Sequence, residues 1–175
     1  LPAGLPLYAI LSNEPWNFAR GFSQSKWFDD RGKENAKTDP DLGTPWGVDD
    51  GWSTATCQYA ADSLHMSRLL KAVMGDRVRP MLKVQIVRFT DFKTPLDAIN
   101  EYYVKKGVKI SDWFWGLAGA PYADLPDAIA KKLDATEEEL LANIYANRTS
   151  EPDVANFVVQ AHALGMKAAF YEYKN

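Results

Sequence analysis

Four short apolar segments along the chain have the length and composition of buried β-strands. The first, residues 7–11, is a continuous apolar run that ends abruptly in Ser12-Asn13-Glu14 before Pro15. Such a run, bounded by turn residues, is typical of a strand buried on both faces, as in a parallel sheet. The other three candidate strands are residues 78–87, 108–118 and 166–172.

Helical patterns separate these strand candidates. Ser53 precedes a predicted helix of about twenty residues, and Gly75 lies where a C-terminal cap belongs. Its apolar positions recur at i, i+3, i+4 and i+7 and are Met66, Leu69, Leu70 and Val73. A shorter helical segment is expected at residues 125–133, and a helical turn at residues 15–22.

Capping-box patterns predict the starts of three further helices. Residues 94–97 open a helix that ends at Gly107 and has Leu96, Ile99 and Tyr103 on one face. Residues 136–139 open a helix that extends to about residue 146. Residues 150–153 open a helix that ends at Gly165, with Val154, Phe157, Val158 and Ala161 at helical spacing.

Residues 23–52 show no apolar periodicity and are rich in Asp, Gly, Lys and Pro. This length far exceeds the usual loop of about 4–6 residues, which predicts a functional or partly disordered segment. Its acidic residues raise a calcium hypothesis, but their spacing does not match the EF-hand loop, and solvated loop charge is the favoured interpretation. These residues are Asp29, Asp30, Asp39, Asp41, Asp49 and Asp50.

The alternation of strands and helices predicts parallel βαβ units with right-handed crossovers. Two α/β architectures compete, a doubly wound open sheet and a (β/α) barrel. Open-sheet nucleotide binders usually have a glycine-rich first turn, and the chain contains neither a P-loop nor a G-x-G-x-x-G motif. The barrel is therefore favoured, although four strands make only half of one.

Composition and charge narrow the class of protein. The 175 residues suit one domain with a sizeable core, and 46% hydrophobic with 25% charged residues is typical of a soluble globular protein. The net charge of −3 gives no reason to expect nucleic acid or a membrane as partner. A single Cys57 excludes a disulfide framework within the chain and a cysteine-cluster metal site. The Leu-Pro-Ala-Gly start leads us to expect a processed form or a piece of a longer protein.

Candidate chemistry follows the strands at their C-terminal ends, which meet at one edge of a parallel sheet. The residues placed there are Asn13, Glu14, Gln85, Tyr122 and Glu172. Two carboxylates, with amides, a phenol and several indoles nearby, are the groups that glycoside hydrolysis requires. One acid protonates the leaving oxygen, and the other attacks or stabilises the anomeric carbon.

Four motifs in the same order resemble those of a known enzyme group. Ser12-Asn13-Glu14-Pro15-Trp16-Asn17 resembles the Asn-Glu signature that ends the fourth barrel strand in clan A retaining glycoside hydrolases. It is most similar to secreted cellulase-like proteins often labelled cellulose-binding. Residues 77–85 are similar to their Arg-Val-Arg-Pro-x-Leu-x-x-Gln strand, residues 120–122 to the Ala-Pro-Tyr of the sixth strand, and residues 170–172 to the Tyr-Glu of the seventh.

The resemblance implies that residues 1–175 form a single partial TIM-type (β/α)8 barrel domain, equivalent to strands four to seven of a larger catalytic domain. Glu14 would be the general acid/base and Glu172 the nucleophile, and Tyr122 would donate a hydrogen bond to Glu172. Asn13 would bind the sugar 2-hydroxyl. Further substrate-binding candidates are Trp16, Asn17, Gln85 and Trp115. The chain departs from the group at Tyr173-Lys174, where Gly-Gly is common, and strands one to three and eight are absent.

The resemblance also implies a secreted protein that binds an oligo- or polysaccharide, with the remaining strands supplied by the same polypeptide or a second chain. No metal or other cofactor is expected. Two alternatives remain open, a non-catalytic carbohydrate-binding protein on the same scaffold and an α/β domain of unrelated function. An intact retaining site predicts carboxyl groups about 5–5.5 Å apart.

Overall fold

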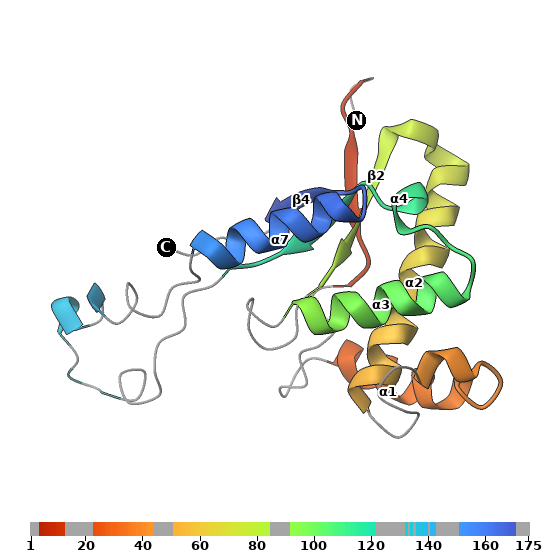
Figure 1. Ribbon diagram of the computed structural model, residues 1–175, viewed down its shortest axis with the longest axis horizontal. Helices are drawn as coiled ribbons and strands as arrows, with labels where there is room; N and C mark the ends of the chain where they lie inside the picture. Colours follow the sequence, from red (N-terminus) through yellow and green to blue (C-terminus); the bar gives the residue numbers. More distant parts are fainter. Residues whose placement is uncertain are drawn as a thin grey trace.

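The four strands form one parallel sheet in which neighbours in sequence are neighbours in space (Figure 1). The computed structural model describes residues 4–12, 23–43, 51–84, 92–121, 132, 134, 136–139, 141–142 and 151–170. The strands are β1 (Leu7–Ile10), β2 (Val78–Lys83), β3 (Gly116–Gly119) and β4 (Lys167–Phe170). The predicted α/β fold built from parallel βα units is therefore confirmed.

The pairing register places one residue from each of the four strands in a single row across the sheet. Ile10 pairs with Met81, Met81 with Gly116, and Gly116 with Lys167. Because side chains alternate between the faces of a strand, residues at even distances from this row share one face and those at odd distances share the other.

Helices connect successive strands. Between β1 and β2 lie α1 (Ser23–Asn35), η1 (Pro40–Gly43), α2 (Gly51–Met74) and η2 (Gly75–Arg77). Between β2 and β3 lie α3 (Lys93–Lys105) and α4 (Ile110–Trp113), and α7 (Glu151–Ala163) precedes β4. Gly75, Gly107 and Gly165, the predicted helix ends, all have positive φ, which glycine adopts without strain.

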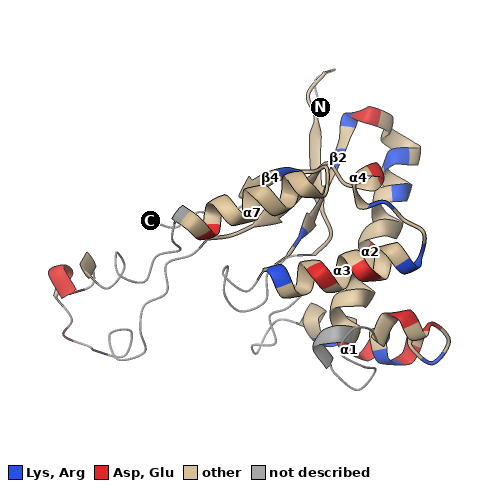
Figure 2. Cartoon of the chain, in the orientation of Figure 1, with Lys and Arg blue, Asp and Glu red and all other residues tan. Residues whose placement is uncertain are grey.

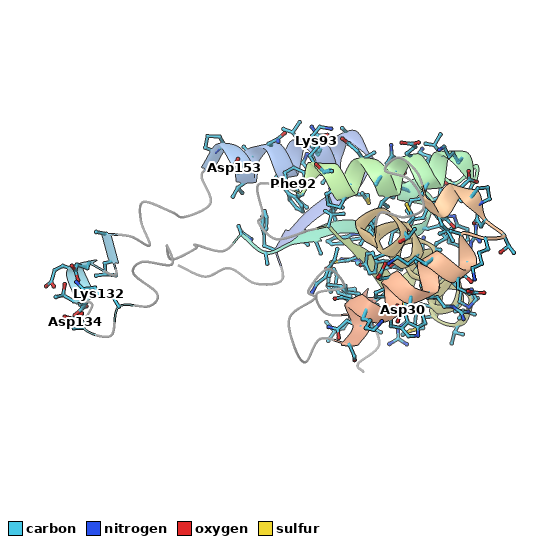
Figure 3. All side chains as sticks on the ribbon, turned by 90° about the horizontal axis from the view of Figure 1, so that it is seen from below. Asp30, Phe92, Lys93, Lys132, Asp134 and Asp153 are labelled. Carbon is cyan, nitrogen blue, oxygen red and sulfur yellow. The ribbon has the colours of Figure 1, made fainter. Side chains whose placement is uncertain are left out.

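The core lies between the helices and one face of the sheet. Leu82 of β2 and Leu117 of β3 are fully buried beside Tyr103 of α3 and Phe157 of α7. Figure 3 shows α3 and α7 on the same side of β3 and β4. Phe92, next to α3, meets Phe157 edge to face at 5.0 Å and joins the two helices. Burial of these large side chains is the main contribution to stability.

The prediction that residues 23–52 lack regular structure is wrong, because α1 and η1 lie within them. The apolar pattern did not predict α1, because this helix buries few large apolar side chains. Its buried residues are Ser25, Phe28 and Gly32. Ion pairs at i,i+4 spacing, Lys26 with Asp30 and Lys33 with Asp29, stabilise its exposed surface.

The predicted helix before Gly75 is confirmed as α2, but the predicted buried face is wrong. Leu69 and Val73 are 55% and 84% exposed. The buried face consists of small, polar and aromatic residues, namely Thr54, Ala55, Cys57, Gln58, Tyr59, Ala60, Ser63, Leu64 and Ser67. Helix α1 packs closely on this face of α2, and close packing favours small residues. The large apolar residues of α2 recur on a different face, so their periodicity predicted the wrong face as buried.

Three further predictions concern the bounds of helices and strands. The structure corrects two of them and confirms the third. The first half of the strand predicted at residues 108–118 contains helix α4, and only its end forms β3. Helix α3 begins at Lys93 with Phe92 as N-cap, without a side-chain capping bond, so the Thr94 capping box is wrong. The second capping box is confirmed, since Thr136 and Glu139 exchange backbone-to-side-chain hydrogen bonds of 3.1 and 3.2 Å. The remaining segments predicted at residues 15–22, 125–133 and 140–146 lie largely outside the described residues.

Candidate functional site

The C-terminal ends of all four strands lie at one edge of the sheet, because the strands are parallel. The last described residues at this edge are Ser12, Val84, Pro121 and Phe170. Seven predicted site residues lie outside the described residues: Asn13, Glu14, Trp16, Asn17, Gln85, Tyr122 and Glu172. Five of them follow the last described residue of a strand within two positions, and these are Asn13, Glu14, Gln85, Tyr122 and Glu172.

Two backbone contacts hold this edge together. The Val84 N–H donates to the Ala118 carbonyl at 3.2 Å and extends the pairing of β2 with β3. On the other side of β2, the Lys83 N–H donates to the Tyr59 hydroxyl of α2 at 3.1 Å. Burial raises the pKa of Tyr59 to about 12, so the hydroxyl remains protonated at neutral pH and accepts through oxygen. A helix side chain thus satisfies the last N–H of β2.

Lys83 is a functional candidate that sequence reasoning missed. Lys83 is only 4% exposed although its side chain ends in an amine that is usually charged and hydrated. By strand alternation its side chain points away from the face that Leu82 contributes to the core. A buried lysine requires an anionic or strongly polar environment. The signal in the sequence was a lone charged residue within the apolar run Met81-Leu82-Lys83-Val84.

Trp115 is the one predicted site residue that the structure describes, and it lies at the opposite edge. It occupies a bend directly before β3, where its N–H donates to the Pro80 carbonyl at 2.8 Å. Trp115 precedes Pro121 by six positions, which corresponds to roughly 20 Å at about 3.3 Å per strand residue. The structure therefore does not bring Trp115 to the edge at which the two glutamate-bearing strands end.

Two further described tryptophans, whose indole faces could in principle stack on a sugar ring, lie on helices. Trp27 on α1 is 51% exposed, with the Arg31 guanidinium 5.9 Å from its ring centre. Trp113 on α4 lies beneath Arg68 and Lys71 of α2, at 5.0 and 5.6 Å from its ring centre. Trp113 thus has a packing role between α4 and α2.

The other ionisable candidates in the described part of the chain are exposed, buried in the core or paired with a lysine. His65 and His162 are exposed on α2 and α7, whereas Cys57 is buried, and burial raises the pKa of its thiol to about 12. Asp39 and Asp41 both accept hydrogen bonds from the Lys106 ammonium, at 2.6 and 2.8 Å. Among these residues no group of three or more His, Cys, Asp or Glu side chains could hold a metal ion.

Comparison with known proteins identifies no relative of this chain. No family model matches the chain, and no curated protein or solved structure is significantly similar to it. No helix in the described segments is both long enough and apolar enough to span a bilayer.

Proposed function

We propose that the protein is a glycoside hydrolase that acts on β-linked glycans by retaining double displacement, on part of a (β/α)8 barrel. The observation that carries this proposal is the sheet order β1-β2-β3-β4 with all strands parallel. It puts the strands that precede Glu14 and Glu172 in one sheet with their C-terminal ends at the same edge. A doubly wound sheet reverses its strand order and has helices on both faces, whereas the core described above lies on one face.

The register by itself does not pair the two glutamates, but an irregular backbone at Ser12 permits it. Glu14 follows Ile10 by four positions, and Glu172 follows Lys167 by five. Ile10 and Lys167 belong to the same row of the sheet. The counts differ by one, so unbroken alternation would direct the two side chains to opposite faces. Ser12, with φ at 59°, interrupts the regular strand between Ile10 and Glu14 and removes that constraint.

In the proposed mechanism Glu172 attacks the anomeric carbon while Glu14 protonates the leaving oxygen. Glu14 then acts as base for the water that hydrolyses the glycosyl-enzyme intermediate. Asn13 and Tyr122 bind the 2-hydroxyl and the nucleophile, as in the resembling group.

The test compares Glu14→Gln and Glu172→Gln in assays with aryl β-glycosides and natural β-glycans. We expect Glu172→Gln to lose turnover on both substrates. Glu14→Gln should lose about 10²–10⁴-fold on natural glycans and less on aryl glycosides, whose good leaving groups need little protonation. Glu138→Gln, an exposed helix position, is the matched control and should retain full activity.

Product analysis and binding complete the test. Proton NMR of the first-formed sugar should show retention of the anomeric configuration. Binding of glycans without turnover in the parent would favour the non-catalytic carbohydrate-binding alternative. The absence of both would leave the α/β scaffold with an unrelated function.

A further inference from the structure

Basic residues gather at the edge of the sheet opposite the candidate site. The strands β2, β3 and β4 begin at this edge, and α4 and the end of α2 lie beside it. Figure 2 shows basic residues around α4 and the end of α2. We call this surface the basic edge, and its members are Arg68, Lys71, Arg77, Arg79, Lys109 and Lys167.

Two tryptophans hold three of these cations in place. The Arg68 guanidinium and the Lys71 ammonium lie 5.0 and 5.6 Å from the ring centre of Trp113. The Arg79 guanidinium lies 5.3 Å from the ring centre of Trp115. An aromatic ring attracts a cation but leaves its charge in place, so these side chains are ordered without being neutralised.

Further contacts bring Lys109 and Lys167 to the same edge. The Lys167 N–H donates to the Trp115 carbonyl at 3.0 Å. Lys109 is the N-cap of α4, and the turn before β4 packs on this helix. A Cβ added to Gly165 in that turn would lie 3.2 Å from the Cβ of Ser111. Both lysines are exposed, so their ammonium groups are accessible from solvent.

Carboxylates neutralise the surface lysines elsewhere in the described chain, but not those of the basic edge. The described lysines that form ion pairs with Asp or Glu are Lys26, Lys33, Lys37, Lys93, Lys105, Lys106 and Lys132. No member of the basic edge pairs with a carboxylate of the described residues. Apart from the basic edge, Arg31 on α1 is the one exposed cation of the described chain without such a pair.

The sequence around these cations contains few acids. Residues 68–79, 109–115 and 165–167 include all six cations and only two acidic residues, Asp76 and Asp112. The chain as a whole has a net charge of −3. The positive charge that the described surface leaves unpaired is therefore concentrated at the basic edge of an otherwise acidic protein.

A surface of this kind suits a ligand with several separate anionic groups. Guanidinium and ammonium groups form charge-assisted hydrogen bonds with carboxylates and phosphates. Duplex DNA carries one charge per about 1.7 Å of its axis, and so dense a polyanion would also meet Asp76, Asp112 and the negative net charge. A polysaccharide with carboxylates on some of its sugars has a lower charge density, which favours it as the ligand.

We propose that the basic edge is a second binding site, separate from the candidate active site, for the carboxylates of an acidic β-linked polysaccharide. Trp115 and the opposite strand ends are roughly 20 Å apart, so a polymer held at the basic edge leaves the candidate active site free. Binding there raises the local concentration of the polymer at the protein. This inference rests on the proposed function for its choice of a β-glycan, but its test requires no turnover.

Two soluble polymers with the same β-linked glucan backbone test the proposal. Carboxymethylcellulose carries carboxylates, whereas hydroxyethylcellulose is uncharged. Titration calorimetry of the Glu172→Gln chain measures their binding while the polymers stay intact. Carboxymethylcellulose should bind at least about tenfold more tightly, because each exposed ion pair is worth up to about fivefold in affinity. Its affinity should fall as salt is added. Equal affinity for the two polymers, or no binding of carboxymethylcellulose, overturns the proposal.

Charge removal at two exposed lysines is the second arm. Lys109→Gln combined with Lys167→Gln should weaken the binding of carboxymethylcellulose about tenfold, since two ion pairs are lost. Lys26→Gln combined with Lys93→Gln is the matched control. It makes the same change in net charge at exposed lysines that are already paired with aspartates, and it should leave the affinity unchanged. Equal losses in the two double variants overturn the proposal, because net charge alone would then explain the binding.

Duplex DNA is the competing polyanion, and it should bind more weakly than carboxymethylcellulose. Binding of DNA with equal or higher affinity overturns the choice of an acidic glycan.

The outcomes are distinguishable from those of the catalytic test. Absence of the proposed hydrolase activity with carboxymethylcellulose still bound at the basic edge rejects the function and keeps the second site. Turnover that depends on Glu14 and Glu172, without binding at the basic edge, rejects the second site and keeps the function.

Discussion

The Tyr59 hydroxyl is a structural contact at the edge where the candidate site lies. It accepts the Lys83 N–H at a point where β1 has already ended, and Tyr59 itself is only 3% exposed. A buried N–H without a partner costs about 1–3 kcal/mol, so this hydroxyl stabilises the last residue of β2. The sequence could predict that Tyr59 lies on a helix, but not that its hydroxyl reaches a strand.

Tyr59→Phe should lower the free energy of unfolding by about 1–3 kcal/mol, because the Lys83 N–H loses its acceptor without gaining water. The measurement is urea denaturation followed by circular dichroism. Tyr102→Phe is the matched control, since no described residue bonds its hydroxyl, and it should change stability by less than about 0.5 kcal/mol. Equal effects of the two substitutions would contradict this role.

Other residue roles were accessible from the sequence. A lone cysteine on a predicted helix, such as Cys57, is more often a small core residue than a nucleophile, and Cys57 is fully buried. The glycine helix ends were correct because a positive φ is a local property of the backbone. Lys83 was missed because the burial of a charge depends on its surroundings and not on its neighbours in sequence.

At the scale of elements, the contact between α1 and α2 depends on Gly32. A Cβ at this position would lie 2.5 Å from the Thr54 carbonyl oxygen, inside van der Waals contact with backbone that cannot move independently. The two helices therefore approach closely at Gly32, and small buried residues on α2 such as Ala55 match this packing.

Gly32→Ala should destabilise the protein by about 1–3 kcal/mol through steric overlap, although alanine is intrinsically the better helix former by about 1 kcal/mol. Thermal unfolding followed at 222 nm measures the change. Glu34→Ala, an exposed position on the same helix, should alter stability by less than about 0.5 kcal/mol. Stabilisation by Gly32→Ala would show that α1 does not pack on α2 in this manner.

Helices were predicted correctly where large apolar residues recur on the buried face, and incorrectly or not at all where they do not. α3 and α7 were predicted with their buried faces, because large apolar residues recur on one side of each, as Leu96, Ile99 and Phe157 illustrate. α2 was predicted with the wrong face, since its buried side is made of small and polar residues. α1 was missed for the same reason, and α4 because four residues carry no periodicity.

At the scale of the whole molecule, the core contains several weak acids that must remain neutral. Burial raises the pKa of Cys57 to about 12, and it raises those of Tyr59 and Tyr102 to about 12 as well. Burial also raises the pKa of Tyr103 well above its ordinary value of 10.0. In each case the folded state binds the proton more tightly than the unfolded state does.

The stability from these groups is fully present below their unfolded pKa values, 9.0 for the thiol and 10.0 for the phenols, and is lost as pH rises through about 12. We therefore expect the free energy of unfolding to decline from about pH 9 upward. Urea denaturation at successive pH values from about 8 to about 11 measures this decline. Cys57→Ala should move the onset from about pH 9 to about pH 10. An unchanged onset would contradict a buried, protonated thiol.

The sequence by itself predicted the order of the four strands and of helices α2, α3 and α7, and that the strands are parallel, because apolar run length, helical periodicity and glycine stops are local signals. It also determined which residues follow each strand, and so brought Glu14 and Glu172 into one hypothesis. Only the tertiary structure decided which face of α2 is buried, that Trp115 lies at the opposite edge from the strand ends that precede the two glutamates, and that Arg79 and Lys167 share one face of the sheet. These properties depend on contacts between residues distant in sequence, and no local pattern encodes such contacts.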